Sequence, residues 1–142
     1  IIKAKIKYPK HVICGYDKVH KFDNVSSSYL PKVVVNSNKE LIYISRAVVP
    51  ASKKINKDGS LINKSVKYYK QVCIYAFNNI ELKKFYSKKK KSETESIEDI
   101  EILRFFDLDV KIKMIKLNSN SVAVDTISDV KKAERLIKKK KY

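Results

Sequence analysis

The sequence predicts an α/β domain in which a mixed β-sheet is flanked by helices. Short runs of alternating apolar and polar residues are typical of strands, and other apolar residues recur at helical spacing behind capping residues. Strands and helices do not alternate strictly, so an α+β arrangement stays open beside an α/β one. The 142 residues match one ordinary domain, and a 44% hydrophobic content supports a core. We therefore expect residues 1–142 to form a single domain.

Six segments are predicted to be strands. The strongest is the fourth, because Val72, Ile74 and Ala76 lie at every second position and point to one side of the sheet. The second and third flank the turn 36–39, which is rich in Asn, and so predict a hairpin. The six segments are residues 11–15, 32–35, 41–44, 68–77, 110–117 and 121–124.

Four segments are predicted to be helical: 1–8, 79–86, 95–108 and a last helix after Thr126. The first ends near Pro9, since proline cannot continue a helix. Ser92 and Glu95 form an S-x-x-E capping box in front of the third. Thr126 caps the last helix, which carries apolar residues on one face. The loop 50–67 is long for a simple connector, which favours a functional or mobile segment.

The formal net charge of +17 allows a polyanionic partner such as nucleic acid or an anionic membrane. The cations are nearly all lysines, and arginine occurs only at positions 46, 104 and 135. A nucleic-acid reader leans more on arginine, whose planar fork makes bidentate contacts. Lysine, isoleucine, asparagine and tyrosine also share AT-rich codons, so mutational bias accounts for much of this composition. A nucleic-acid partner is therefore not favoured.

Several other classes of protein are excluded by what the sequence lacks. Cys14 and Cys73 form no C-x-x-C pair, which indicates reduced thiols rather than a disulfide framework. His11 and His20 have no Cys or carboxylate neighbours at metal-binding spacing. There is no membrane-length apolar run, no signal peptide, no Ser/His/Asp set and no Gly-rich phosphate loop. These features favour a cytoplasmic location.

Four short segments carry a resemblance to a known family. They are Lys32-Val33-Val34 with Tyr43-x-Ser45-Arg46-x-x-x-Pro50, then Tyr69-Lys70-Gln71-Val72-Cys73-Ile74-Tyr75-Ala76-Phe77, then Glu98-x-x-Glu101-x-Leu103-Arg104, and Ala123-Val124-Asp125-Thr126-x-x-Asp129. In this order and at these spacings they resemble the C-terminal portion of the 3-deoxy-manno-octulosonate cytidylyltransferase (CMP-Kdo synthetase) and acylneuraminate cytidylyltransferase family. The matched segments cover most of the chain from Lys32 onward.

The resemblance implies a nucleotide-diphospho-sugar transferase-like (GT-A-like) fold and a homodimer. It also implies transfer of CMP from CTP to a 2-keto-3-deoxy sugar acid, with Mg²⁺ and release of pyrophosphate, for cell-surface lipopolysaccharide biosynthesis. The family's N-terminal nucleotide loop, which contains arginine and glycine, has no counterpart here. We therefore expect the N-terminal nucleotide-binding portion to be absent from this chain, and the chain alone to be inactive.

Five residues are candidates for binding the sugar acid. Arg46 follows an apolar strand and is suited to clamp the sugar carboxylate, although a surface ion pair is the simpler alternative. Gln71 and Tyr75 share one face of the strongest strand and can point into one pocket. The family usually has His at the position of Gln71, which leaves the identity of the sugar open. For Tyr75 the alternative is core packing. By resemblance Glu101 binds sugar hydroxyls and Arg104 supports it, whereas an ordinary i, i+3 pair is the alternative.

Asp125 is the candidate metal ligand. It ends a short apolar strand, and Mg²⁺ is usually held by one or two carboxylates with phosphate oxygens. The resemblance makes Asp125 one of two metal carboxylates, and the alternative is a helix N-cap. Ala123 and Ile127 replace the glycine and proline that the family often has around this position. No residue is assigned a catalytic role.

Two other functions remain as alternatives. A basic module for RNA or another polyanion would stack bases on Tyr68 and Tyr69 and neutralise phosphates with the flanking lysines, and its binding would fall steeply with salt. A relative without catalytic activity would only dimerise or bind a sugar.

Overall fold

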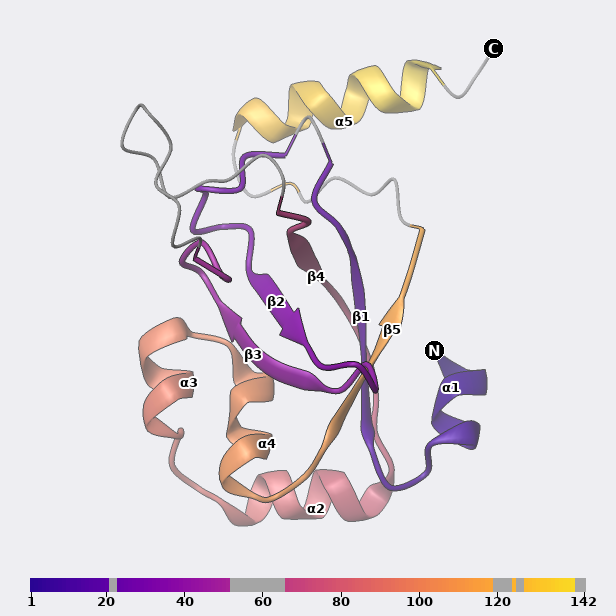
Figure 1. The fold of residues 1–142 in the computed structure, drawn as a ribbon, viewed down its shortest axis with the longest axis vertical. Helices are drawn as coiled ribbons and strands as arrows, with labels where there is room; N and C mark the ends of the chain where they lie inside the picture. Colours follow the sequence, from indigo (N-terminus) through magenta and orange to yellow (C-terminus); the bar gives the residue numbers. More distant parts are fainter. Residues whose placement is uncertain (21–22, 52–65, 119–123, 125–126, 140–142) are drawn as a thin grey trace.

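A five-stranded mixed sheet forms the centre of the protein (Figure 1). The computed structural model describes residues 1–20, 23–51, 66–118, 124 and 127–139. The strand order is β3-β2-β4-β1-β5, and β1 runs parallel to β5 and antiparallel to β4. Strand β2 is antiparallel to both β3 and β4. The strands are β1 (Val12–Lys18), β2 (Lys32–Val35), β3 (Leu41–Ser45), β4 (Tyr69–Ala76) and β5 (Ile112–Lys116). The predicted mixed sheet with flanking helices is confirmed.

The helices lie around the sheet. In Figure 1, α2 lies at one end of the molecule and α5 crosses the opposite end, while α3 and α4 lie beside β3. The capping box predicted at Ser92 is present, and a second one formed by Asn78 and Glu81 starts α2. The helices are α1 (Ile2–Lys7), α2 (Asn79–Ser87), α3 (Glu93–Glu98), α4 (Arg104–Asp107) and α5 (Ile127–Lys139), with a 3-10 turn η1 (Glu101–Leu103). The predictions for 1–8 and 79–86 are confirmed.

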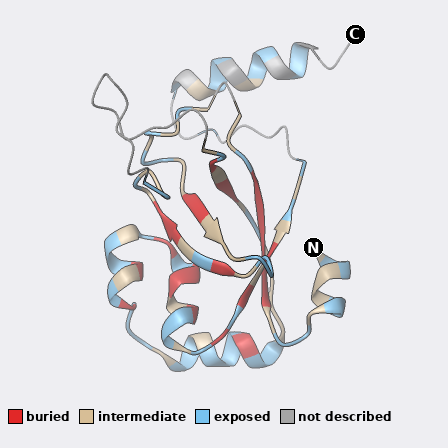
Figure 2. Ribbon diagram, viewed as in Figure 1, coloured by how far each residue is buried: buried red, intermediate tan, exposed pale blue. Residues whose placement is uncertain are grey.

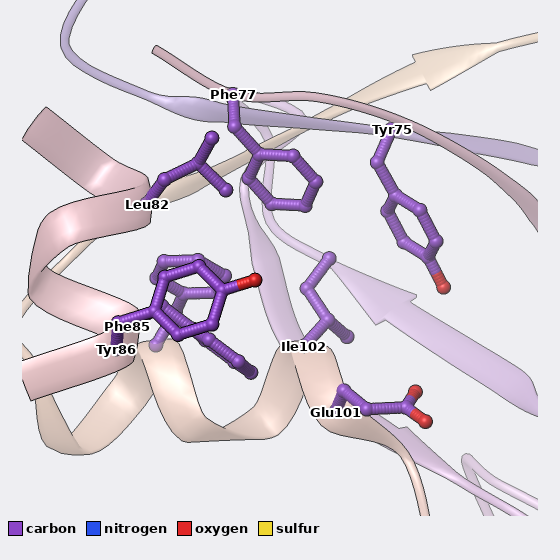
Figure 3. A pocket seen from close by; sticks show the side chains of 8 residues that line it. Tyr75, Phe77, Leu82, Phe85, Tyr86, Glu101 and Ile102 are labelled. Atoms are coloured by element: carbon purple, nitrogen blue, oxygen red, sulfur yellow. The ribbon is translucent and has the colours of Figure 1, made fainter. Parts of the chain in front are cut away.

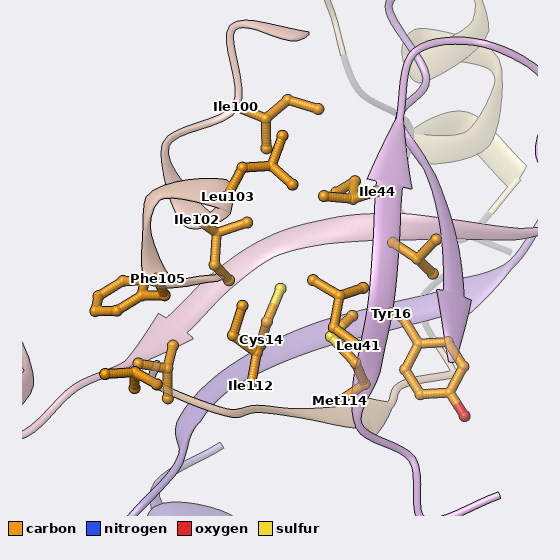
Figure 4. Packing of buried hydrophobic residues seen from close by; sticks show 13 residues of the cluster. Cys14, Tyr16, Leu41, Ile44, Ile100, Ile102, Leu103, Phe105, Ile112 and Met114 are labelled. Atoms are coloured by element: carbon orange, nitrogen blue, oxygen red, sulfur yellow. The ribbon is translucent and has the colours of Figure 1, made fainter. Parts of the chain in front are cut away.

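The β2–β3 hairpin folds over the sheet and encloses the core. Its turn forms a bridge between Glu40 and Lys113 of β5, and the amide of Met114 donates to the carbonyl of Lys39 at 2.7 Å. Most of the buried residues lie on the strands and on α4 (Figure 2). The core cluster joins the strands to η1 and α4 (Figure 4) and consists of Val12, Cys14, Tyr16, Val33, Leu41, Ile44, Ile100, Ile102, Leu103, Phe105, Val110, Ile112 and Met114.

The prediction of one continuous helix over 95–108 is wrong. Helix α3 ends at Glu98, Asp99 adopts a left-handed conformation with φ of 51°, and the chain resumes as η1 and α4. Within one helix only a single stripe faces the core. The break places Ile100, Ile102 and Phe105 together in the core, while Ile97 is left 74% exposed. Burial of apolar area thus outweighs the helical periodicity read from the sequence.

Strand β4 does not keep the alternation expected of residues 68–77. Cys14 pairs with Tyr75 but the next residue, Gly15, pairs with Val72, so Cys73 and Ile74 bulge out of the ladder. Both bulged residues are exposed. A Cβ on Gly15 would lie only 2.7 Å from Cγ2 of Ile74. The bulged strand therefore closes over Gly15 because this residue has no side chain.

Three sequence predictions lie wholly or mainly outside the described residues. They are the strand 121–124, the N-cap at Thr126 and most of the loop 50–67. Strand β1 is longer than the predicted 11–15, because its continuation to Lys18 still pairs with β4. Across the described part of the chain, no helix is both long and apolar enough to span a membrane.

Gly15→Ala is expected to lower the free energy of unfolding by about 1–3 kcal/mol, the usual cost of overpacking a core. The new methyl would meet Ile74 and, at 2.7 Å, Cδ1 of Leu117. Adding Ile74→Ala should recover part of the loss, because it removes one of the three atoms that crowd the new methyl; the others are Cδ1 of Leu117 and the Val72 carbonyl oxygen at 3.2 Å. Urea unfolding measures both effects, with Ser96→Ala on the exposed face of α3 as the control. An unchanged midpoint for Gly15→Ala would contradict this account of the bulge.

Candidate functional site

An apolar pocket of about 310 Å³ lies between β4, α2, η1 and α4 (Figure 3). It brings together segments that are far apart in the sequence: the end of β4, one face of α2, and the break that follows α3. Most of the lining side chains are aromatic or aliphatic, as in many small-molecule sites. The lining residues are Tyr75, Phe77, Leu82, Phe85, Tyr86, Glu101, Ile102 and Phe105.

The pocket has a polar end and an aromatic end. Figure 3 shows the Tyr75 hydroxyl and the Glu101 carboxylate on the same side, with the ring of Phe77 and the α2 side chains on the other. Phe105 stacks on Phe77 at a centroid distance of 5.7 Å and contacts Phe85 at 5.3 Å. These contacts fix the positions of rings from α2, from α4 and from the connection between β4 and α2. The arrangement suits a ligand with an apolar face and a hydroxyl-bearing edge.

Tyr75 and Gln71 are directly bonded. The Gln71 Nε2 donates to the Tyr75 hydroxyl oxygen at 2.6 Å. In a regular strand, residues four apart are separated by about 13 Å, too far for this contact. The bulge at Cys73 and Ile74 brings them together. Burial raises the pKa of Tyr75 well above its ordinary value, with further increases from the nearby Cys14 and Cys73. Tyr75 is therefore a neutral hydroxyl at physiological pH.

Gln71 does not itself line the pocket. Its side chain is buried at 9% exposure, between Tyr75 and the thiol of Cys14. The two residues were predicted to point into one pocket; the structure places Tyr75 there and Gln71 behind it.

Arg104 supports the pocket from outside. Its guanidinium makes two hydrogen bonds to the Glu95 carboxylate, at 2.6 and 2.7 Å, and lies 3.9 Å from the centre of the Phe85 ring. The i, i+3 pair with Glu101 is not formed; Glu101 is exposed at the pocket instead. Arg104 thereby connects α3 to α2 and holds one aromatic wall in place. The hydrogen bonds from Arg104 lower the pKa of Glu95.

The Arg46 guanidinium is hydrogen-bonded to backbone carbonyls. Its guanidinium donates to the carbonyls of Glu98 at 2.5 Å, Ser28 at 2.8 Å and Asp99 at 3.2 Å. The Glu98 carboxylate in turn accepts from the Arg46 amide at 2.7 Å and from the Ser45 hydroxyl at 2.6 Å. Arg46 thus joins the end of β3 to the end of α3, and it is not among the residues that line the pocket.

Lys32 completes this junction from β2. Its side chain is fully buried and its Nζ donates to the carbonyls of Ser27 and Arg46, at 2.9 and 2.5 Å. Burial lowers the pKa of Lys32, while the nearby Glu98 carboxylate opposes that change. Lys32 and Glu98 stand in the segments that carry the family resemblance, but no pattern in the sequence predicted that both would lie at this junction.

The candidate metal ligand Asp125 lies outside the described residues. Among the residues that the structure does describe, no group of three or more His, Cys, Asp or Glu side chains is placed to hold a metal ion. The assignment of Asp125 to Mg²⁺ therefore stays a prediction. Cys14 and Cys73 are free thiols, as expected.

The prediction that Tyr68 and Tyr69 form an exposed surface for stacking bases is wrong. Tyr68 is 6% exposed and Lys70 is 5% exposed, so neither is available to a base or a phosphate. Tyr69 packs against Tyr16 at a ring distance of 5.4 Å. Lys70 is held by an ion pair with Asp23 at 2.8 Å, so this lysine is bound within the protein.

Known proteins resemble this chain over most of its length, although no family model matches it. A 3-deoxy-manno-octulosonate cytidylyltransferase of Phocaeicola vulgatus is 32% identical over 124 residues, which are 87% of this chain and 47% of that protein. The enzyme of the same name from Bacteroides thetaiotaomicron is 34% identical over 116 residues, 82% of this chain and 44% of that protein. The chain is similar to the C-terminal portion of the 3-deoxy-manno-octulosonate cytidylyltransferases. It spans about half the length of the curated relatives it matches.

A solved structure agrees with this cytidylyltransferase resemblance. The structure of CMP:2-keto-3-deoxy-manno-octonic acid synthetase complexed with CTP superposes with a TM-score of 0.78 at 23% identity. The match covers 98% of this chain and 54% of the synthetase. The predicted nucleotide-sugar transferase-like fold is thereby confirmed.

Arg104→Met is expected to lower the free energy of unfolding by about 2–3 kcal/mol, because it leaves Glu95 buried without its cation. The expected loss is smaller than for a fully buried ion pair, because the Arg104 side chain is 13% exposed. Urea unfolding at pH 7 measures the loss. A change within the error of the exposed control Glu134→Gln would contradict the structural role of the pair.

The pair of Arg104 and Glu95 also predicts how the free energy of unfolding depends on pH. Because Arg104 lowers the pKa of Glu95 in the folded state, the unfolded chain takes up that proton more readily. The stabilisation is present above the unfolded pKa of about 4.3 and is lost as pH falls toward the lower folded value. The double variant Glu95→Gln with Arg104→Met should therefore lose less stability than the wild type between pH 6 and pH 3. Glu40 and Asp99 also have lowered pKa values, but both residues are present in the wild type and in the double variant. The difference between the two proteins therefore reports on Glu95.

Proposed function

We propose that this chain is the sugar-acid-binding portion of a cytidylyltransferase that transfers CMP from CTP to a Kdo-like 2-keto-3-deoxy sugar acid and releases pyrophosphate. The observation that carries the proposal is the pocket. It brings Tyr75 and Glu101, from two separate segments of family resemblance, to one polar edge beside an aromatic wall. The similarity to 3-deoxy-manno-octulosonate cytidylyltransferases supports it.

The chemistry of the pocket fits a sugar. The apolar C–H groups of a sugar pack against aromatic rings such as Phe77 and Phe105, and sugar hydroxyls bond polar groups at the edge. The neutral hydroxyl of Tyr75 donates a hydrogen bond, and the Glu101 carboxylate accepts one. Because a hydroxyl group both donates and accepts, this pair is complementary to it.

The remaining parts of the proposal concern cofactor and partners. We propose Asp125 as one Mg²⁺ ligand, with a bound Mg²⁺ supplying charge neutralisation at the phosphates and a lower pKa for the attacking hydroxyl. The proposal includes a homodimer in the cytoplasm that serves cell-surface polysaccharide biosynthesis. CTP would be held mainly by a portion of the enzyme outside this chain, because the relatives are about twice its length.

Glu101→Gln is expected to weaken binding of 3-deoxy-manno-octulosonate by about tenfold, because a charge-assisted hydrogen bond becomes a neutral one. Isothermal titration calorimetry on the 142-residue chain measures the change. The matched control is Glu134→Gln on α5, which removes the same charge at the opposite end of the molecule from α2 (Figure 1). Equal affinities for the wild type and Glu101→Gln would remove Glu101 from the site.

We expect the 142-residue chain alone to release no pyrophosphate from CTP in the presence of Mg²⁺ and the sugar acid. The reason is that the pocket described here offers no phosphate-binding cations among its lining residues. A coupled pyrophosphate assay with chromatography of CMP-sugar measures this. Sustained formation of CMP-sugar by the isolated chain would show that it holds a complete nucleotide site.

A further inference from the structure

The oxygen of Tyr75 is held by an amide rather than by a titratable group. Gln71 Nε2 lies 2.6 Å from the Tyr75 oxygen and 4.0 Å from the Cys14 sulfur. The Cys14 thiol donates its own hydrogen to the carbonyl of Gly15 at 3.4 Å. The sulfur therefore faces Gln71 as an acceptor, which agrees with an amide nitrogen that points toward Tyr75 and Cys14. Each of the two amide hydrogens has an acceptor, one on Tyr75 and one on Cys14.

This arrangement decides the role of the tyrosine hydroxyl. An amide nitrogen donates hydrogen bonds and does not accept them, so Gln71 cannot take up the phenolic hydrogen. That hydrogen stays on Tyr75, because burial keeps the pKa of Tyr75 above its ordinary value. Figure 3 shows the hydroxyl on the side of the pocket where Glu101 lies. Cys73 also hydrogen-bonds the Tyr75 hydroxyl, so a ligand at the polar edge would compete with Cys73 for this hydrogen.

We propose that Gln71 is a positioning residue, whose amide holds the Tyr75 oxygen as an acceptor so that Tyr75 presents its hydroxyl hydrogen to the ligand. This inference rests on the proposed function, which assigns the pocket to a sugar acid. Gln71 acts through Tyr75, since it is buried behind the lining residues.

A histidine at this position would behave differently. A protonated imidazole donates to Tyr75 as the amide does, whereas a neutral imidazole can accept the phenolic hydrogen and turn it away from the pocket. Glutamine does not titrate, so the donor state of Tyr75 does not change with pH through this contact. The titratable groups that face Tyr75 are Cys14 on β1, Cys73 on β4 and Glu101 on η1. Cys73 and Glu101 keep their surroundings in variants of Gln71, whereas Cys14 loses its contact with the Gln71 amide. The variant Cys14→Ser, compared with the wild type, measures what that lost contact contributes.

The first test does not need a ligand. Tyrosine labelled with ¹³C at Cζ gives an NMR signal that responds to hydrogen bonding at the oxygen, and Tyr75→Phe identifies the signal of Tyr75. Gln71→Met keeps the length of the side chain without its donors and should shift this signal. Tyr29→Phe, at an exposed tyrosine, is the control and should leave it in place. Gln71→His should make the signal depend on pH near the ordinary histidine pKa of about 6.5, whereas the wild-type signal stays constant there.

The second test measures affinity for 3-deoxy-manno-octulosonate between pH 5.5 and 8. We expect Gln71→Met to bind about tenfold more weakly than the wild type, the effect of one misdirected hydrogen bond. Gln71→His should lose affinity as pH rises through its own titration, while the wild type shows no such step. A purely structural role for Gln71 would not create a new pH-dependent step in binding.

The two tests separate this inference from the proposed function. An identical Tyr75 signal in the wild type and Gln71→Met would overturn the positioning role, whatever the protein binds. A shifted signal without binding of the sugar acid by the wild type would overturn the assignment of the pocket, and with it the ligand half of this inference. A shifted signal with equal affinity for wild type and Gln71→Met would show that the orientation of Tyr75 does not matter for binding.

Discussion

The close approach of β4 to Gly15 is the contact on which the pocket depends. Because Gly15 has no side chain, Ile74 can lie directly over it, and β4 gains two residues at this point relative to β1. The bulge shortens the separation of Gln71 and Tyr75 enough for a hydrogen bond of 2.6 Å. A regular strand would keep these side chains apart and aim Tyr75 differently. One backbone contact in the sheet thereby sets the orientation of a side chain in the pocket.

Two polar junctions hold the helical wall against the sheet. Arg104 and Glu95 connect α3 to the ring of Phe85, and Arg46 with Glu98 connects the end of β3 to the end of α3. A buried charge is tolerated only when it is paired and hydrogen-bonded, so the buried Glu95 fixes the first junction closely. The second junction is partly exposed and is held by several hydrogen bonds instead. Some residues within the segments of family resemblance are therefore explained by the scaffold. The resemblance alone did not distinguish these residues from those that meet a ligand.

The sequence predicted the parts of the fold that have local causes. The Asn-rich turn specified the hairpin, and Ser92 specified the start of α3, because a turn or cap is decided within a few residues. The break at Asp99 and the bulge in β4 were missed, since both follow from packing between distant segments. At the site, resemblance led to Tyr75 and Glu101, which line the pocket. Phe85 and Phe105 were missed, because their convergence depends on the break after α3.

The charge of the protein and the charge of the pocket act at different ranges. A net charge of +17 attracts anions over several ångströms, and this attraction weakens with salt. Within the pocket the charge has the opposite sign, because Glu101 is the one ionisable acid or base with a full charge among the lining residues. A sugar acid drawn in by the general field would therefore place its hydroxyls toward Glu101 and its carboxylate away from it. In the proposed function the field brings the anion to the protein, while the pocket decides which end of it enters.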